Sequence, residues 1–286
     1  MPLEVKTSIH AAVWGPDWSA DAIGPTLESA ARAGYDHVVI PLRRFEDIVP
    51  RRLARAFEQC GLAPLNACGL APDRDIGAAD PAIRERGVSH LCHAVALARD
   101  MGSTQIGGVL YGPLAKAGEP VTDDAFARAA DAMRRVAEVA QAAGVRLALE
   151  VVNRYETALL YNTARGLAFL DAVAHDNVYL HLDTFHMSID EAAPFAALQA
   201  ALPRLAYFEL DQSHRGAPFE GSLDLADWAR RASAAGYRGI VGVEAFSRSK
   251  LAPDHANALA VWEDHFSDGD LMAVEFMRII RAAFEA

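Results

Sequence analysis

The stretch "VRLALEVV" (145–152) is an apolar run that carries one acid, Glu150, close to its end. Such a run predicts a strand buried on both faces, which is the usual state of a strand in a parallel sheet. A helical segment follows, and the next apolar run, "NVYLHLD" (177–183), again ends on an acid, Asp183. Parallel strands joined by a helix form the repeating unit of the α/β folds, so this stretch predicts that class.

The same unit repeats along the whole chain. The predicted strands lie near 5–10, 37–42, 62–67, 103–110, 145–152, 177–183, 204–210 and 239–245. The predicted helices lie near 19–33, 50–60, 81–101, 122–143, 163–174, 191–201, 224–235 and 270–284. Glycines such as Gly34 and Gly61 mark predicted helix ends, and Thr122 and Asp80 are predicted helix caps.

Eight such units in 286 residues match a (β/α)8 TIM barrel, which typically needs ~250 residues. The competing fold is a doubly wound sheet, which normally carries a glycine-rich phosphate loop after an early strand. Neither GxGxxG nor GxxxxGK occurs in the sequence, and the glycines of "IGGVLYG" (106–112) precede no helix start. We therefore predict an α/β protein with one TIM-barrel domain, residues 1–286.

Composition narrows the class of partner. The net charge of −11 disfavours nucleic acid, whose binding proteins usually present a basic surface. The three cysteines have no CxxC spacing, which fits a reducing cytoplasm rather than a disulfide framework or a zinc site. The start, "MPLEVKTSIH" (1–10), has no apolar core of a signal peptide, and no apolar segment approaches ~18 residues. We expect a soluble cytoplasmic protein with no nucleic-acid or membrane partner.

Four acids occupy corresponding places in four consecutive units. Glu150, Asp183, Glu209 and Glu244 each lie near the end of a predicted strand. One acid after an apolar run is usually a solvated strand end or a helix cap. In a barrel, however, the carboxyl ends of the strands converge on one mouth, where four carboxylates repel one another unless a cation or protons neutralise them. Oxygen ligands suit Mg²⁺ or Mn²⁺, so the pattern predicts a divalent-metal site.

Two segments carry a resemblance to a known family. "ALEVVNRYE" (148–156) and "LDTFHMSIDE" (182–191) resemble the signature segments of the D-tagatose/D-psicose 3-epimerases. These are xylose-isomerase-like TIM barrels of the sugar phosphate isomerase/epimerase superfamily. "WGPDW" (14–18) and "AVWEDHFSDGD" (260–270) add to the likeness. The resemblance implies a small-molecule sugar substrate, a metal that is usually Mn²⁺, and a homodimer or homotetramer.

The resemblance also implies roles for individual residues. Glu150, Asp183 and Glu244 match three metal ligands, and the two glutamates match the acid/base pair that stands on opposite faces of the sugar. A metal that bridges the carbonyl and the adjacent hydroxyl stabilises the cis-enediolate that forms when C3 loses its proton. One carboxylate removes that proton and the other returns one to the opposite face, which inverts C3.

Further residues are expected to contact the substrate. Glu156, His186 and Arg215 match positions that hydrogen-bond the ketose near its carbonyl. Trp14 lies in the loop after the first strand, where an indole face could form an apolar wall over the substrate carbons. We expect His181, in contrast, to be a buried, hydrogen-bonded histidine rather than a ligand.

The segment "RLAYFELDQSHRG" (204–216) departs from the family pattern. The family's third ligand is a histidine, and Glu209 stands in its place here. Either Glu209 is the ligand, or His214 swings in, or water completes the shell. We predict Glu209, and therefore a set of four carboxylates that favours Mn²⁺ or Mg²⁺ over Co²⁺.

The departure leaves the reaction open. The leading prediction is a metal-dependent epimerase that inverts C3 of an unphosphorylated ketose or a close derivative. A lyase that decarboxylates a 3-keto sugar acid would use the same enediolate chemistry. An aldose–ketose isomerase and a non-catalytic sugar-binding protein are the remaining alternatives.

Overall fold

Each predicted apolar run is a strand of one closed barrel. The computed structural model, which describes residues 3–285, places eight parallel strands side by side in chain order, with β8 beside β1. The strands are β1 Lys6–His10, β2 His37–Pro41, β3 Ala63–Ala67, β4 Gln105–Gly108, β5 Arg146–Val151, β6 Val178–Asp183, β7 Leu205–Leu210 and β8 Ile240–Val243. The TIM-barrel prediction is confirmed.

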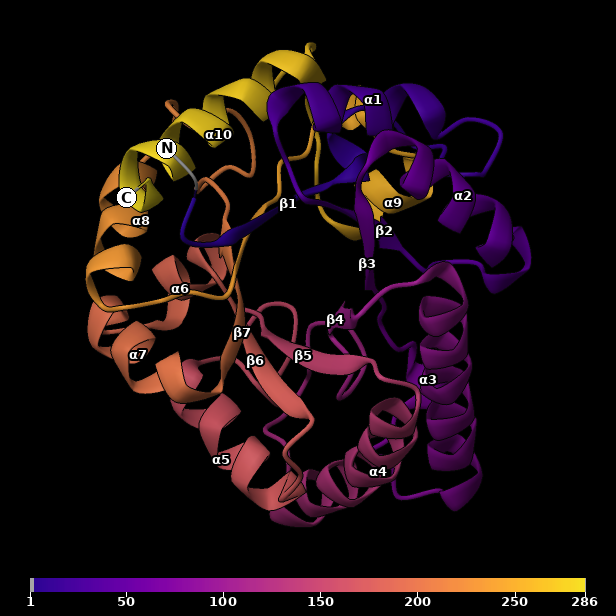
Figure 1. Cartoon of the computed structure of the whole chain (residues 1–286). Helices are drawn as coiled ribbons and strands as arrows, with labels where there is room; N and C mark the ends of the chain where they lie inside the picture. Colours follow the sequence, from indigo (N-terminus) through magenta and orange to yellow (C-terminus); the bar gives the residue numbers. More distant parts are fainter. Residues whose placement is uncertain (1–2, 286) are drawn as a thin grey trace.

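Helices surround the strands (Figure 1). They are α1 Gly24–Ala33, α2 Pro50–Cys60, α3 Pro81–Met101, α4 Asp123–Ala142, α5 Thr163–Val173, α6 Thr184–Asp190, α7 Pro194–Ala201, α8 Leu225–Ala234, α9 Pro253–Ala258 and α10 Gly269–Phe284. Short 3-10 turns cover Ala11–Val13, Phe45–Asp47, Pro72–Arg74, Leu202–Arg204 and Arg248–Lys250. All eight predicted helices are present, although the first begins at Gly24 and not near residue 19.

Two short helices were not predicted. The helix α6 directly follows β6, because the Asp183 side chain accepts the backbone N–H groups of Phe185 and His186 and so caps it. The helix α9 follows the eighth strand, between Pro253 and Ala258. Both lie after strand ends, so they belong to the loops at the mouth of the barrel.

The predicted caps are confirmed. Gly34 ends α1 with a φ of 92°, which a residue with a side chain rarely adopts. Thr122 caps α4 by accepting the Ala125 N–H, and Asp80 caps α3 by accepting the Ala82 N–H. These local signals explain why the helix limits agree with the sequence.

The centre of the barrel is filled with side chains. Val39, Leu65, Tyr207 and Ile240 form a buried cluster. They come from β2, β3, β7 and β8, so they meet inside the barrel rather than under the outer helices. Tyr207 and Ile240 precede the predicted site acids on their strands. The cluster therefore closes the barrel beneath the mouth, and the acids above it lie on a packed floor.

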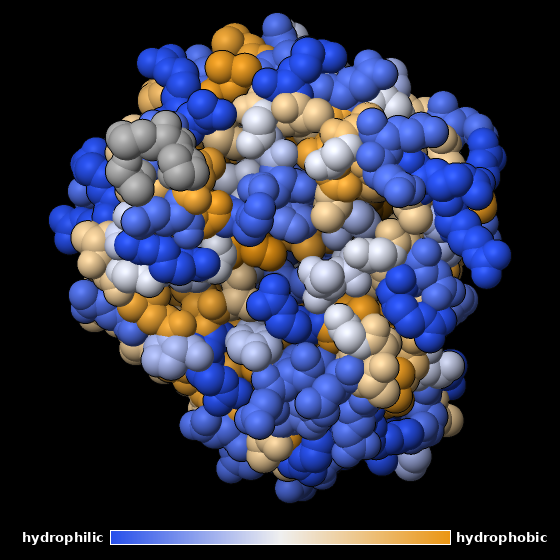
Figure 2. Space-filling model, in the orientation of Figure 1, coloured by the Kyte–Doolittle hydropathy of each residue, from blue (hydrophilic) through white to orange (hydrophobic). Residues whose placement is uncertain are grey.

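The outer surface is mostly polar on the face that Figure 2 shows, with scattered apolar side chains. Within residues 3–285, each helix is too short or too polar to cross a lipid bilayer.

Candidate active site

The ends of β5 to β8 bring the four predicted acids together. Their oxygens fall into overlapping groups of three possible ligand atoms that all lie within 4.8 Å of one another. The groups are Glu150–Asp183–His186, Asp183–Asp211–Glu244, His10–Glu209–Glu244 and Glu150–His181–Glu209. Glu150 and Glu244 each share one group with Asp183 and one with Glu209. The four acids are here called the acid ring; Glu150 and Glu244 come from the two outer strand ends, β5 and β8, and Asp183 and Glu209 from the two strand ends between them.

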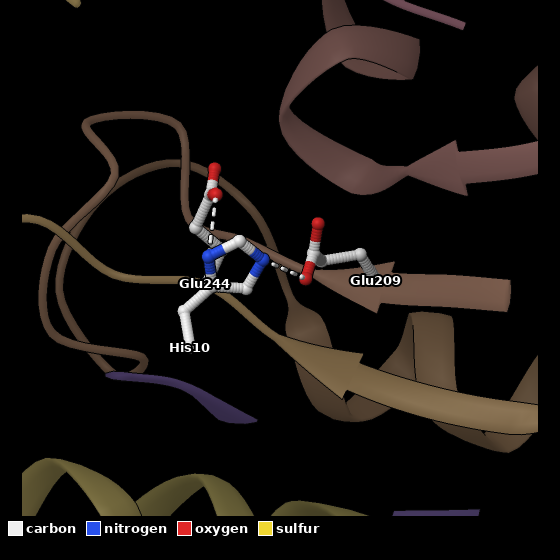
Figure 3. A group of neighbouring side chains, drawn as sticks. All are labelled: His10, Glu209 and Glu244. Atoms are coloured by element: carbon white, nitrogen blue, oxygen red, sulfur yellow. Dashed lines mark ion pairs between the residues drawn. The ribbon is translucent and has the colours of Figure 1, made fainter. Parts of the chain in front are cut away.

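Glu209 is buried in β7 and is compensated by neighbouring polar side chains. His181 Nε2 lies 3.0 Å from its Oε2. His10 Nε2 lies 3.6 Å from its Oε1, the contact that Figure 3 shows. The Tyr207 hydroxyl donates to Oε1 over 3.3 Å. Burial disfavours the carboxylate, but the charges of His181 and His10 outweigh it and lower the pKa of Glu209. Without these partners, a buried carboxylate would be costly.

The same two histidines reach the neighbouring acids. His10 Nδ1 lies 3.4 Å from Glu244 Oε1, as Figure 3 shows, and His181 Nδ1 lies 3.9 Å from Glu150 Oε2. Burial opposes a charge on His181, but Glu150 and Glu209 outweigh it and raise its pKa to about 9. For His10 burial prevails and lowers the pKa. His181 is buried and hydrogen-bonded, as the sequence predicted.

His186, in α6, has its ring fixed by a neighbouring loop. The Asn153 backbone N–H lies 3.1 Å from His186 Nδ1, so Nδ1 is the acceptor. The proton is therefore on Nε2, which faces Glu150 Oε1 at 3.4 Å. Burial disfavours ionisation of Glu150, but His181 and His186 lower its pKa to about 2. Glu156 lies beside this pair and accepts the Asn153 side-chain amide at 2.9 Å.

Asp183 and Asp211 carry the clearest sign of a missing positive charge. Asp183 Oδ2 and Asp211 Oδ1 are buried and have no hydrogen-bond partner within residues 3–285. Burial raises the pKa of Asp183 to about 8 and that of Asp211 to about 7. Both belong to one ligand group with Glu244. Orphaned carboxylate oxygens that converge in this way fit a divalent cation.

Arg215 supplies a positive charge from the chain itself. Its Nε donates to Asp211 Oδ2 over 2.9 Å, and its Nη2 donates to Glu244 Oε2. The guanidinium lies 4.8 Å from the ring centre of Phe185 and 4.6 Å from that of Phe246. Arg215 has a φ of 59°, uncommon for a residue with a side chain and often seen where a functional group must be aimed.

A cavity of about 500 Å³ opens beside the acid ring. Glu150 and Glu244 lie in its wall, together with apolar side chains that include Leu42, Val109 and Phe246. Its size and its mixture of apolar wall and converging polar groups suit a small ligand.

Two residues of the sequence analysis, Trp14 and His214, lie elsewhere. The Trp14 indole N–H donates to Asp270 over 2.7 Å, so Trp14 packs against the start of α10 and not along the cavity wall that Glu150 and Glu244 share. His214 packs against His265, with ring centres 5.0 Å apart, and belongs to none of the described ligand groups. Gln212 donates to the carbonyls of Pro218 and Leu223 and fixes the loop after β7.

Three residues of the site were missed. His10 ends the first predicted strand, and its position at a strand end was the signal that could have found it. Asp211 follows Glu209 by two residues, so strand alternation places both on one face. Asn153, which fixes His186, has no signal in sequence because its partner lies in another βα unit.

The comparisons with known proteins agree with this geometry. Residues 27–265 match the model of the family described as xylose isomerase-like TIM barrel. The chain is 34% identical to an L-ribulose 3-epimerase of Methylomonas sp. (strain DH-1) over 99% of both chains. It is 35% identical to an L-ribulose 3-epimerase of Mesorhizobium japonicum, covering 94% of this chain and 90% of the relative.

Solved structures give the same result. The crystal structure of a D-allulose 3-epimerase from Methylomonas sp., in complex with D-allulose, superposes with a TM-score of 0.94 at 34% identity. It covers 99% of this chain and 98% of that chain. The chain therefore belongs to the xylose isomerase-like TIM barrel family and, within it, to the ketose 3-epimerases.

Proposed function

We propose that this enzyme inverts C3 of an unphosphorylated ketose, or of a close derivative, with the help of a divalent metal. The observation that carries the proposal is that Glu150 and Glu244 line one cavity from the two outer strand ends of the row β5 to β8, with Asp183 and Glu209 between them. Inversion needs one base on each face of the reacting carbon, and two carboxylates arranged in this way can supply them. The relatives named as ketose 3-epimerases support the same reaction.

We propose that Glu150, Asp183, Glu209 and Glu244 bind the metal, with Mn²⁺ favoured, Mg²⁺ second and Co²⁺ less suitable. The orphaned oxygen of Asp183 supports this set, and Asp211 is an additional oxygen donor within reach. When bound, the cation supplies positive charge to the carbonyl and hydroxyl oxygens of the sugar and so acidifies the neighbouring C–H.

The chain's own residues move the proton. Because the pKa of Glu150 lies near 2, this carboxylate is ionised at neutral pH and starts as a base. The Nε2–H of His186 faces Glu150 and keeps it oriented. We propose that Glu150 takes the C3 proton of one epimer and Glu244 returns a proton to the other face, with the roles exchanged in the reverse direction.

We propose that Glu156, His186 and Arg215 orient the ketose near its carbonyl. His186 and Arg215 contact the proposed acid/base pair directly, which supports a place beside the reacting carbon. A role for Trp14 as a wall over the substrate has less support, because its indole is bound to Asp270.

The test is epimerisation of a ketohexose in D₂O with added Mn²⁺. The wild-type protein is expected to interconvert the C3 epimers and to incorporate deuterium at C3 of the recovered sugar. Glu150→Gln and Glu244→Gln are each expected to lower turnover by about 10²–10⁴-fold or more while the circular-dichroism spectrum stays unchanged. Glu220→Gln, at an exposed loop glutamate, is the control and should keep full activity.

Near-wild-type turnover in either Gln variant would rule out the two-base assignment. Release of CO₂ from a 3-keto sugar acid, without exchange at C3 of a ketose, would favour the lyase instead.

We further propose that residues 1–286 act as one domain, that the protein works in the cytoplasm, and that it forms a homodimer or homotetramer. Exposed aromatic side chains, among them Tyr155, Phe219 and Trp262, are available for subunit contacts. Light scattering coupled to size exclusion measures the oligomeric state, and a monomer would contradict the last of these proposals.

A further inference from the structure

Five side chains form a continuous line that joins the two proposed acid/base residues. The line runs from Glu150 to His181 (3.9 Å), from His181 to Glu209 (3.0 Å), from Glu209 to His10 (3.6 Å) and from His10 to Glu244 (3.4 Å). We call these five residues the histidine–glutamate network. Glu209 is its centre, and Figure 3 shows the half that contains His10 and Glu244.

Each histidine of the network uses both ring nitrogens. His181 faces Glu209 with Nε2 and Glu150 with Nδ1, and His10 faces Glu209 with Nε2 and Glu244 with Nδ1. The two nitrogens of an imidazole are held at a fixed separation by a rigid ring. Each ring therefore acts as a spacer between Glu209 and one acid/base glutamate.

The Tyr207 side chain restrains one of these two rings, that of His181. The Tyr207 ring packs edge-on against His181, with centres 4.5 Å apart, and its hydroxyl bonds Ser8 at 2.5 Å. Gly242 makes space for Tyr207, since a methyl group there would collide with the Tyr207 hydroxyl. Packing thus holds His181 in the orientation in which it meets both carboxylates.

We propose that His10 and His181 are positioning residues that, through Glu209, fix the places of Glu150 and Glu244 on either side of the substrate. The proposal rests on the acid/base roles given to Glu150 and Glu244 above. Proton transfer requires the carboxylate within about 2.6–3.2 Å of the proton it moves, and a displacement near 1 Å costs about 10²-fold in rate. Partners of metal-binding carboxylates act in the same way on metal affinity.

The test compares His181→Gln, His181→Ala, His10→Ala and Glu209→Gln by three measurements: the Mn²⁺ dissociation constant by calorimetry, kcat and KM at saturating Mn²⁺, and Tm. Each Ala variant is expected to weaken Mn²⁺ binding or lower kcat by about 10–100-fold, with KM changed much less. His181→Gln keeps a donor near the place of Nε2 and is expected to recover part of the loss. His37→Ala is the matched control, because His37 is a strand histidine whose ring meets the Thr7 carbonyl.

A double-mutant comparison tests the path through Glu209. In a Glu209→Gln background, His10→Ala and His181→Ala are expected to add little further loss, since the residue through which they act is already changed. The proposal would be overturned if the losses in the double variants were fully additive. It would also be overturned if the single variants lowered Tm while kcat and Mn²⁺ affinity stayed within twofold of wild type. If the wild type turns over no ketose, the proposed function fails, while the Mn²⁺ titrations still test how the histidines act on Glu209.

Discussion

Glu209 shows what a single buried carboxylate requires. Its side chain is 1% exposed within a strand whose other residues are mostly apolar. An unpaired carboxylate there would cost several kcal/mol. Two imidazoles and one phenol offset that cost, so Glu209 tolerates burial only because residues from three different strands meet it. The neighbours that balance the charge of this carboxylate need not suit an imidazole in its place. A histidine at this position is therefore expected to change the chemistry of the site.

Glu209→His is expected to keep metal binding but to change which metal is preferred. An imidazole nitrogen is a softer donor than a carboxylate oxygen, so the variant should gain affinity for Co²⁺ or Zn²⁺ relative to Mn²⁺ by about tenfold. Competition titrations with Mn²⁺, Co²⁺ and Zn²⁺ measure the order, and Glu220→His is the control. An unchanged order would show that Glu209 is not a ligand.

At the scale of elements, a large side chain of β7 fits beside a residue of β8 that has no side chain. Gly242 of β8 lies opposite Glu209 in the strand pairing, and the Tyr207 ring fills the space that a side chain at 242 would need. This pairing sets the height of Tyr207 in the barrel and therefore the place from which its hydroxyl reaches Glu209.

Gly242→Ala is expected to destabilise the protein by about 1–3 kcal/mol, because the added methyl group forces Tyr207 to move inside a packed barrel. Urea unfolding followed by fluorescence measures the change. Gly24→Ala is the control, since nothing lies within 4 Å of a methyl group at that position of α1. Equal stability of the two variants would mean that Tyr207 has room to shift.

Elements whose signals are local were predictable from the sequence. The signals for a buried strand or a capped helix lie within a short stretch of sequence. For this reason the observed limits of β5 and α4 agree with the prediction. The helix α6 was missed because its first turn depends on Asp183, a residue that the pattern assigns to a strand end. Similarly, the four acids were predictable because strand ends converge, whereas His10 meets Glu244 only once β1 has paired with β8.

For the whole molecule, closure of the barrel determines which charged side chains meet at its mouth. The acids come from the second half of the chain, while His10 comes from its first strand. Closure therefore brings the first strand to the last acid and completes the network that neither half contains alone.

The metal-free protein is expected to lose stability as pH rises from about 7 to 9, above the range in which histidines with a lowered pKa, such as His10, titrate. Asp183 and Asp211 keep their protons to about pH 8 and 7 in the folded protein, although both would ionise near pH 4 in the unfolded chain. His181 likewise stays protonated to about pH 9, above the usual pKa near 6.5. The folded state thus holds more protons than the unfolded state over this interval, so a rise in pH favours unfolding.

Calorimetric Tm values between pH 7 and 9, with EDTA and with Mn²⁺, measure this dependence. The fall should be clear in EDTA and smaller in Mn²⁺, because a cation replaces the protons on the carboxylates. Asp183→Asn is the control and should flatten the EDTA curve. A Tm in EDTA that is constant or rises with pH would contradict the assignment.

Arg215 affects the order in which the newly made protein folds and binds its proposed metal. Its guanidinium is part of the chain, lies between Phe185 and Phe246, and contacts Asp211 and Glu244 as soon as the barrel closes. Part of the repulsion among the carboxylates is therefore relieved without any outside ion. A newly synthesised chain can fold first and take up its proposed metal afterwards. Metal supply would then set how much of the enzyme is active, while bound metal adds stability to a chain that has already folded.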